Sequence, residues 1–240
     1  MSSVIAFPQV VSERARMSRT QVWRMSIILF PIVLTVVYIA MLASKVTRPL
    51  AVLMTQENYP VELGTFLFAV IAGIQSLYLP RQVKRAGANK LFIAFYIIFG
   101  IGLIWVGLEE IDYGQWFLHW KTPEAISRIN TQHEFNMHNI EGLGGHTEYL
   151  RLAFGVGGLM GVALSFFTWF RAVSVSRLLV TWFAVITVLA ACDLYCDIKA
   201  LDTNFAKAMD VMSEVVELMI SMAASIYLWI KAKELNHNPL

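Results

Sequence analysis

Long apolar runs, separated by short polar stretches, dominate the pattern along the chain. Within each run the apolar residues lack the regular polar interruptions of an amphipathic surface helix. The run 25–44 contains no charged residue, and about 20 apolar residues are enough for a helix to cross the hydrocarbon core of a bilayer. The pattern predicts six membrane-spanning helices, at residues 25–44, 61–80, 91–109, 149–170, 178–198 and 209–230.

Composition supports this interpretation. Hydrophobic residues make up 57% of the 240 residues and charged residues only 15%, whereas a soluble domain carries about a quarter charged residues. The net charge of +2 and the lack of a basic patch interleaved with aromatics exclude a nucleic-acid partner. The sequence therefore predicts an all-α, polytopic helical membrane protein surrounded by membrane lipids.

The basic residues predict the orientation. Twelve of the 19 Lys and Arg residues lie in the segments 1–24, 81–90, 171–177 and 231–240, and short cytoplasmic segments are typically rich in these residues. We therefore expect a multi-pass protein of the cell (inner) membrane with both termini in the cytoplasm. Its parts would be an N-terminal tail (1–24), a membrane domain (25–230) that includes an outer segment (110–148), and a C-terminal tail (231–240).

The outer segment has helix signals of its own. Thr122, Pro123 and Glu124 form a typical helix start, with a capping hydroxyl, a proline and an acid in the first turn. The glycines within 142–145 are a typical stop. These signals predict an outer amphipathic helix over residues 123–140, lying against the bundle.

Acidic residues gather on the predicted outer side, where they need a compensating charge. Asp193 and Asp197 share a face of the fifth span, and Glu214 and Glu217 share a face of the sixth. Ionisable groups within spans are costly and usually functional. Crowded carboxylates cannot all be ionised without a positive partner. The nearby bases, Arg151 among them, are too few, which favours a bound cation over purely structural ion pairs, although those stay open.

The predicted outer helix would add ligands to the same site. Asn130, Glu134, His138 and Glu141 would lie along one stripe of that helix, and carboxylate and imidazole groups together suit zinc or iron. The expected metal ligands are Glu134, His138, Asp193, Asp197, Glu214 and Glu217, with Glu110 as a general base. The expected supporting polar residues are Glu109, Gln115, Asn130, His133, His146 and Arg151.

Two strings in the outer segment resemble a known group of proteins. They are Glu-Glu-Ile-Asp-Tyr-Gly-Gln at 109–115 and Asn-x-Gln-x-Glu-x-Asn-x-His-Asn at 130–139. Similar strings occur in uncharacterised bacterial polytopic membrane proteins, where Ser and Trp stand in place of Asp112 and Tyr113. The resemblance covers about 30 residues and implies a shared outer element, but no activity.

Three functions are compatible with these features. The first is a metal-dependent membrane enzyme that acts on a lipid or an amide at the outer surface, with zinc or iron as its divalent metal. The second is a non-catalytic subunit or assembly factor that binds other membrane subunits through the outer segment or the glycine-rich fourth span, where Gly157 and Gly161 have the spacing of close helix contacts. The third is a proton-coupled transporter, which the absence of acids from the inner half of the spans disfavours.

Overall fold

The computed structural model describes residues 18–57, 59–85, 87–130, 133–137, 140 and 147–237. These residues form helices and connections without a β-strand, as predicted for an all-α protein. The α-helices are α1 (Arg19–Ala43), α2 (Arg48–Met54), α3 (Pro60–Arg85), α4 (Lys90–Glu109), α5 (Gln115–Leu118), α6 (Glu124–Ser127), α7 (Thr147–Leu164), α8 (Val180–Ile198) and α9 (Asn204–His237). Three 3₁₀ turns complete them: η1 (Asp112–Gly114), η2 (Thr168–Phe170) and η3 (Arg177–Leu179).

Five of these helices are long and apolar enough to cross a membrane: α1, α3, α4, α8 together with η3, and α9. The remaining expected span corresponds to α7, which has 18 residues and a length of roughly 27 Å at 1.5 Å per residue. It carries two charged side chains, Glu148 and Arg151, and both are buried against the neighbouring helices. Five of the six predicted spans thus correspond to helices able to cross a membrane, and the remaining one corresponds to α7, which is not among those five.

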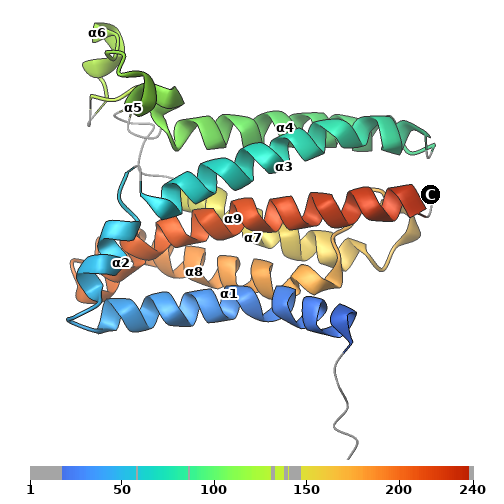
Figure 1. The fold of residues 1–240 in the computed structure, drawn as a ribbon, viewed down its shortest axis with the longest axis horizontal. Coiled ribbons are helices and arrows are strands. Elements are labelled where there is room, and N and C mark those ends of the chain that lie inside the picture. Colours follow the sequence, from blue (N-terminus) through green and yellow to red (C-terminus); the bar gives the residue numbers. More distant parts are fainter. Residues whose placement is uncertain are drawn as a thin grey trace, which may run out of the picture.

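Helix α9 occupies the middle of the bundle (Figure 1). The hairpin of α3 and α4 packs on one side of it, and the hairpin of α7 and α8 packs on the other. Helix α1 lies against α8 and also contacts α9. The central position of α9 agrees with its apolar burial, since Met212, Val215, Met219, Ala223 and Leu228 are almost completely inaccessible.

Glycines allow the helices of each hairpin to approach closely. A Cβ atom on Gly73 of α3 would lie 2.8 Å from the carbonyl oxygen of Gly100 on α4, and one on Gly158 of α7 would overlap the ring of Phe183 on α8. Small residues serve this purpose in many membrane helix pairs. Within the glycine pair expected from the sequence, Gly161 packs against Val175, whereas the Cβ position of Gly157 has nothing within 4 Å.

The two ends of the bundle differ in charge. The basic end holds the α3–α4 turn, the connection 165–179 and the last turns of α9, and the start of α1 lies there too (Figure 1). The acidic end is the opposite one.

The fourth span ends at Leu164 rather than at the expected residue 170, because the chain turns back so that the Val175 amide donates to the Gly161 carbonyl (2.9 Å).

A separate lobe rises from the acidic end beyond α4 (Figure 1). We define the lobe as the described residues between Glu110 and Ile140. The helix expected over 123–140 is present only as α6, and the expectation is wrong for the described residues from Arg128 onward. Asparagine side chains often compete with the helical hydrogen bonds. Here Asn130 Nδ2 donates to the Asn136 carbonyl (3.0 Å), and Asn130 Oδ1 accepts from the Glu134 amide (3.2 Å).

The backbone of the lobe excludes a continuous helix for a second reason. His133 has a φ of 62°, in the left-handed region, and Asn130 forms an antiparallel bridge with Ile140. Asn130 and Glu134 therefore do not lie on one helical stripe as expected. The other two members of that stripe, His138 and Glu141, lie outside the described residues.

Candidate functional site

The end of α4 anchors the lobe through Glu109. This side chain is 8% exposed. Its Oε1 accepts from the Tyr113 hydroxyl and its Oε2 from the Met137 amide, both at 2.6 Å. Trp105 Nε1 donates to the same hydroxyl (2.6 Å). Burial, with the hydrogen bond to Glu109, raises the pKa of Tyr113 to about 12, so the hydroxyl keeps its proton and remains a donor. Glu109 therefore has a structural role.

The carboxyl group of the next residue, Glu110, lies beside α9 instead. Oxygen atoms of Glu110, Glu214 and Glu217 all lie within 4.8 Å of one another. We call these three residues the bundle triad. Glu214 and Glu217 lie on one face of α9 because they are three residues apart, and Glu110 caps the C-terminal end of α4. All three side chains are partly buried.

Among the described residues, one guanidinium group borders the bundle triad. Arg151 of α7 donates from Nη1 to Glu217 Oε1 (2.8 Å) and from Nη2 to Asp193 Oδ2 of α8 (2.9 Å). The residue is 9% exposed. Within the described part of the chain its buried Nε atom has no hydrogen-bond partner. Arg151 thus joins α7, α8 and α9 at the level of the triad.

The charges around the bundle triad do not balance. Arg151 offers one positive charge, which it shares between Glu217 and Asp193. Glu62, in the first turn of α3, is close enough for its charge to act on Glu110 and Glu214. Carboxylates this close to one another cannot all stay ionised without added protons or a cation. The bundle triad is therefore a group of oxygen ligands suited to a hard cation or to shared protons.

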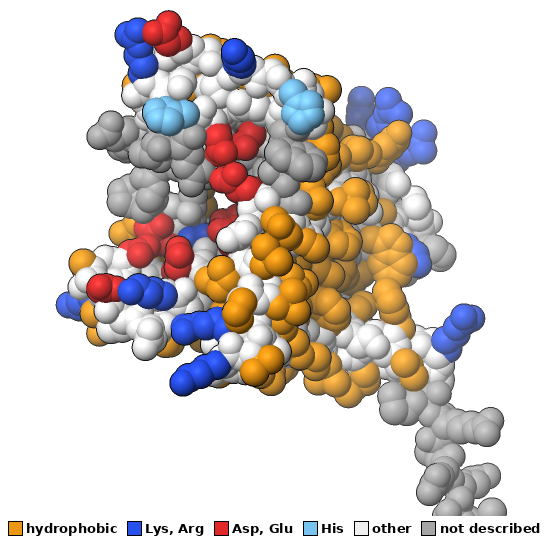
Figure 2. Space-filling view, turned by 60° about the vertical axis from the view of Figure 1, so that its left-hand side comes forward, with side chains coloured by type: hydrophobic (Ala, Val, Ile, Leu, Met, Phe, Trp, Pro, Cys, Tyr) orange, Lys and Arg blue, Asp and Glu red, His pale blue; other side chains and the backbone are white. Residues whose placement is uncertain are grey.

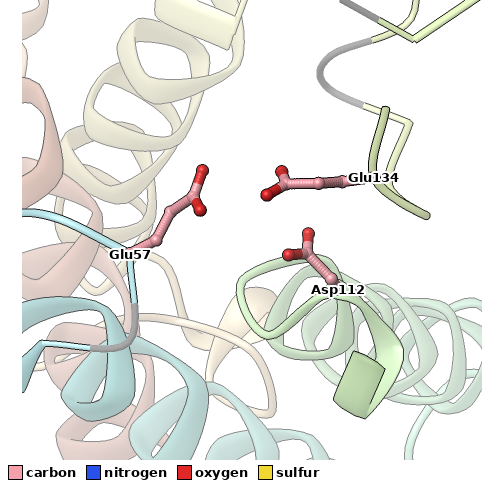
Figure 3. Close-up of side chains that lie close together, drawn as sticks. All are labelled: Glu57, Asp112 and Glu134. Carbon is pink, nitrogen blue, oxygen red and sulfur yellow. The ribbon is translucent and has the colours of Figure 1, made fainter. Parts of the chain in front are cut away.

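A second group of acids lies where the lobe meets the turn between α2 and α3. Glu57, Asp112 and Glu134 bring carboxylate oxygens within 4.8 Å of one another, and Figure 3 shows their side chains pointing toward a common centre. We call these residues the lobe triad. Asn136 Nδ2 donates to Asp112 Oδ1 (2.6 Å) and to Glu134 Oε2 (3.2 Å). This amide fixes two of the three carboxyl groups.

Glu134 of the lobe triad has an altered acidity. Burial, followed by the negative charges of Asp112 and Glu57, raises the pKa of Glu134 from 4.5 to about 7. A carboxyl group with this pKa can both release and accept a proton near neutral pH. Its role in the structure is therefore different from that of an exposed, permanently charged surface acid.

The two triads belong to one acidic region. Asp112 follows Glu110 by two residues, so the short segment between α4 and η1 contributes to both triads. Figure 2 shows acidic side chains in the middle of this end of the molecule, between the lobe and the bundle. The region lies at the ends of the apolar helices, and it is the largest concentration of carboxyl groups visible in this view.

The sequence predicts His138 as a metal ligand and His133 and His146 as supporting residues, but no histidine among the described residues belongs to either triad. His133 is exposed, and its Nδ1 lies 2.7 Å from the Ser127 carbonyl oxygen. His119 is exposed at the end of α5. His138 and His146 lie outside the described residues. The described chain therefore offers oxygen ligands alone in these two groups.

The remaining residues expected at the site have separate positions. Asp197 is exposed on α8, and Asp193 belongs to the Arg151 ion pair rather than to a triad. Gln115 supports the lobe, since its Nε2 donates to Thr122 Oγ1 (2.8 Å) and its Oε1 accepts from the Phe135 amide (2.9 Å). Asn130 supports the lobe through the hydrogen bonds described above.

Sequence reasoning did not select Glu57 or Asp112. Glu57 precedes α3 in a short turn, and the sequence places no Asp, Glu or His three or four residues after it, so only the packing of the lobe reveals its neighbours. Asp112 stands inside the string 109–115, and its position two residues after Glu110 was a usable signal.

Comparison with known proteins assigns no relative to the chain. No family model matches the sequence, and no curated protein or solved structure is significantly similar to it.

Proposed function

We propose that this protein is a metal-dependent membrane enzyme that binds a divalent cation at the bundle triad and acts on a lipid or an amide at the acidic end. The observation that carries the proposal is the convergence of Glu110, Glu214 and Glu217 within 4.8 Å beside a single, shared guanidinium. This arrangement leaves more negative charge than the neighbouring protein groups neutralise, and a divalent cation would correct the imbalance.

The ligand chemistry narrows the choice of cation. Carboxylate oxygens suit hard cations such as magnesium, calcium and manganese, and they also bind iron and zinc. The zinc or iron expected from the sequence depended on a histidine, and the histidine chosen for that purpose lies outside the described residues. An oxygen-only triad therefore favours a hard divalent cation, with iron as the transition-metal alternative.

The neighbouring groups would supply the rest of the chemistry. A bound cation polarises a carbonyl group or acidifies a water molecule. Glu134, whose pKa is about 7, would accept a proton in the space between the lobe and the bundle. Arg151 would hold Glu217 in position through its 2.8 Å hydrogen bond. The location at the ends of apolar helices favours lipid substrates, whose ester and amide groups lie at that depth.

A metal count on purified protein tests the first half of this proposal. We expect stoichiometric divalent metal in the wild type and loss of that metal in Glu214→Gln and Glu217→Gln. Glu124→Gln is the matched control, because Glu124 is an exposed acid that pairs with Arg128 on α6. Equal metal contents in wild type and in the two triad variants would contradict the proposal.

An activity screen tests the second half. Wild-type protein in detergent or vesicles should hydrolyse at least one member of a panel of phospholipids, ceramides and acyl amides. A chelator should abolish that turnover, and added magnesium or manganese should restore it. If bound metal is confirmed and the panel stays inert, the catalytic half is wrong while the metal site stands.

A second candidate function is a non-catalytic subunit that binds a partner through the lobe. The observation in its favour is apolar exposure: Phe117, Leu118, Ile129 and Met137 are 49%, 73%, 48% and 45% exposed on the lobe. A stable partner retained in mild detergent, and lost from Leu118→Glu but not from Glu214→Gln, would favour this function over the enzyme.

A further inference from the structure

A polar cavity lies at the basic end, far from the two acidic triads. It has a volume of about 370 Å³ and is formed by the connection 165–179 and the last turns of α9. The side chains that matter for its chemistry are Ser165, Ser174, Ser176, Arg171, Arg177 and Lys231. A volume of this size is at the small end of the range for ligand-binding pockets.

Positive charge exceeds negative charge in the lining. Arg171, Arg177 and Lys231 face a single lining carboxylate, Glu234. Lys231 is only 2% exposed, and its Nζ donates to Glu234 Oε2 (2.6 Å) and to the Arg171 carbonyl (3.1 Å). Since one carboxylate cannot neutralise three cations, the cavity is suited to an anion.

An unsatisfied hydroxyl supports the same conclusion. The Oγ atom of Ser165 is buried and has no hydrogen-bond partner within the described residues. A buried polar group without a partner is destabilising, because it has lost its hydrogen bonds to water. Because Ser165 lines the cavity, a ligand with acceptor oxygens would provide the missing partner.

The surroundings of the cavity are those of a membrane surface. Phe166, Phe167 and Trp169 are 68%, 61% and 58% exposed on the same connection, and the Arg177 guanidinium lies 4.2 Å from the centre of the Phe166 ring. Exposed aromatic residues at helix ends typically lie at the level of the lipid headgroups. Basic pockets at that level bind anionic headgroups.

We propose that the cavity at the basic end is a binding site for the phosphate group of an anionic phospholipid. Arg171 and Arg177 would contact the phosphate oxygens from the open side, and the Ser165 hydroxyl would donate from the closed side. The acyl chains would extend past the exposed aromatics onto the apolar surface of the bundle. This site is independent of the cation at the acidic end.

Binding to the delipidated full-length protein tests the proposal. Native mass spectrometry in mild detergent would measure the binding of phosphatidylglycerol, phosphatidylcholine and inorganic phosphate to wild type, Arg177→Gln, Ser165→Ala and Lys233→Gln. Lys233 is the matched control, because its Nζ lies over the Trp229 ring (3.6 Å) rather than in the cavity. Thermal unfolding without lipid would show that each variant is folded.

We expect phosphatidylglycerol to bind more tightly than phosphatidylcholine. Arg177→Gln should weaken that binding about fivefold, the effect of one cation near an anionic headgroup, and Ser165→Ala should weaken it as well, whereas Lys233→Gln should not. Saturable binding of inorganic phosphate with the same variant pattern would support a phosphate site supplied from solution. Binding that ignores Arg177→Gln and Ser165→Ala, or that shows no preference for the anionic lipid, would overturn the proposal.

Discussion

At the scale of single residues, Arg151 forms buried ion pairs with two carboxylates in the bundle. Its two terminal nitrogens hold Asp193 and Glu217 at 2.9 and 2.8 Å, so one side chain connects three helices and positions one member of the bundle triad. A buried ion pair contributes little net stability when both partners are present, but the loss of one partner leaves a buried charge without compensation. The effect of removing Arg151 therefore differs from that of removing a surface arginine.

The first prediction concerns this side chain. Arg151→Gln should lower the free energy of unfolding by about 3–5 kcal/mol, because Asp193 and Glu217 lose their guanidinium partner. Arg128→Gln is the control, since the Arg128–Glu124 pair is highly exposed and should contribute no more than about 1 kcal/mol. Denaturant unfolding in detergent measures both. Similar values for the two variants would show that Arg151 is not a buried link.

The second prediction concerns the proton on Glu134. The pKa of Glu134 is about 7 in the folded lobe and 4.5 ordinarily, so the folded state binds the proton more tightly than the unfolded chain. The contribution of this group is complete below about pH 4.5 and is lost as the pH rises toward 7. Amide hydrogen exchange in the lobe should therefore become less protected between pH 5 and 7.5.

A variant that lacks the titratable carboxyl group of Glu134 tests whether this group causes the pH dependence. Glu134→Gln should keep the protection of the lobe constant between pH 5 and 7.5, apart from the intrinsic pH dependence of exchange. Glu124→Gln, in the same lobe but outside the lobe triad, should behave as the wild type does. If Glu134→Gln leaves the pH dependence unchanged, another group is responsible for it.

At the scale of helices, the α7–α8 pair depends on one face of α7. Gly155 packs against Thr187 and Gly158 against Phe183, whereas Gly157 faces open space. A side chain at position 155 or 158 would therefore collide with α8, whereas position 157 has room for one. Spacing alone cannot reveal this difference, because the glycines at 155, 157, 158 and 161 are too dense for a single motif to select the contact face.

The third prediction uses two of these glycines. Gly158→Ala should destabilise the protein by about 1–3 kcal/mol, since the added methyl group must displace the buried ring of Phe183. Gly157→Ala should be neutral or stabilising by up to about 1 kcal/mol, since alanine favours the helix and meets no neighbour. Thermal unfolding in detergent, at matched lipid content, measures the pair. A larger loss for Gly157→Ala would contradict the helix packing.

The sequence predicts the helices better than it predicts the lobe. Apolar runs of about 20 residues have few alternatives in a membrane, which is why 91–109 and α4 nearly coincide. The lobe depends on hydrogen bonds of the Asn130 side chain and on left-handed residues such as His133, and helix-capping signals at Thr122–Glu124 do not encode either. The helix-start residues predict that a helix begins in the lobe, but they do not predict how the rest of the lobe folds.

The sequence likewise predicts only part of the candidate site. Glu214 and Glu217 are neighbours on one helical face, so spacing was sufficient to group them, and Glu110 was selected because it ends an apolar run. Glu57 and Asp112 join Glu134 only through the packing of the α2–α3 turn beside the lobe. Such contacts, in which Glu57 lies 55 residues from Asp112 and 77 residues from Glu134, leave no periodic signal in one sequence.

At the scale of the whole molecule, the bundle is polar at both ends and apolar between them. The lobe lies at one end and the α3–α4 turn at the other (Figure 1). Both triads belong to the lobe end, and the polar cavity formed by the connection 165–179 and the last turns of α9 belongs to the opposite end. The basic residues of the α3–α4 turn favour the cytoplasm for their end. The lobe would then lie on the opposite side of the membrane.

The fourth prediction tests this orientation. In a chain with Cys192 and Cys196 replaced by alanine, Glu124→Cys on the lobe should react with an impermeant maleimide in intact cells. Asn89→Cys, which is exposed in the α3–α4 turn, should react only after the membrane is permeabilised. Labelling of both positions from the same side would contradict the arrangement of α3 and α4 across the membrane.

The central position of α9 has a consequence for how the protein is made. The α3–α4 and α7–α8 hairpins meet mainly across α9, and α9 follows both hairpins in the chain, so a ribosome synthesises it after them. The inner faces of the two hairpins therefore stay uncovered in the bilayer until α9 has been inserted. Because Glu214 and Glu217 arrive with α9, a chain that stops short of this helix has no bundle triad. Loss of the proposed cation would thus have two explanations, incomplete synthesis or insertion of α9 and a defect in the ligands.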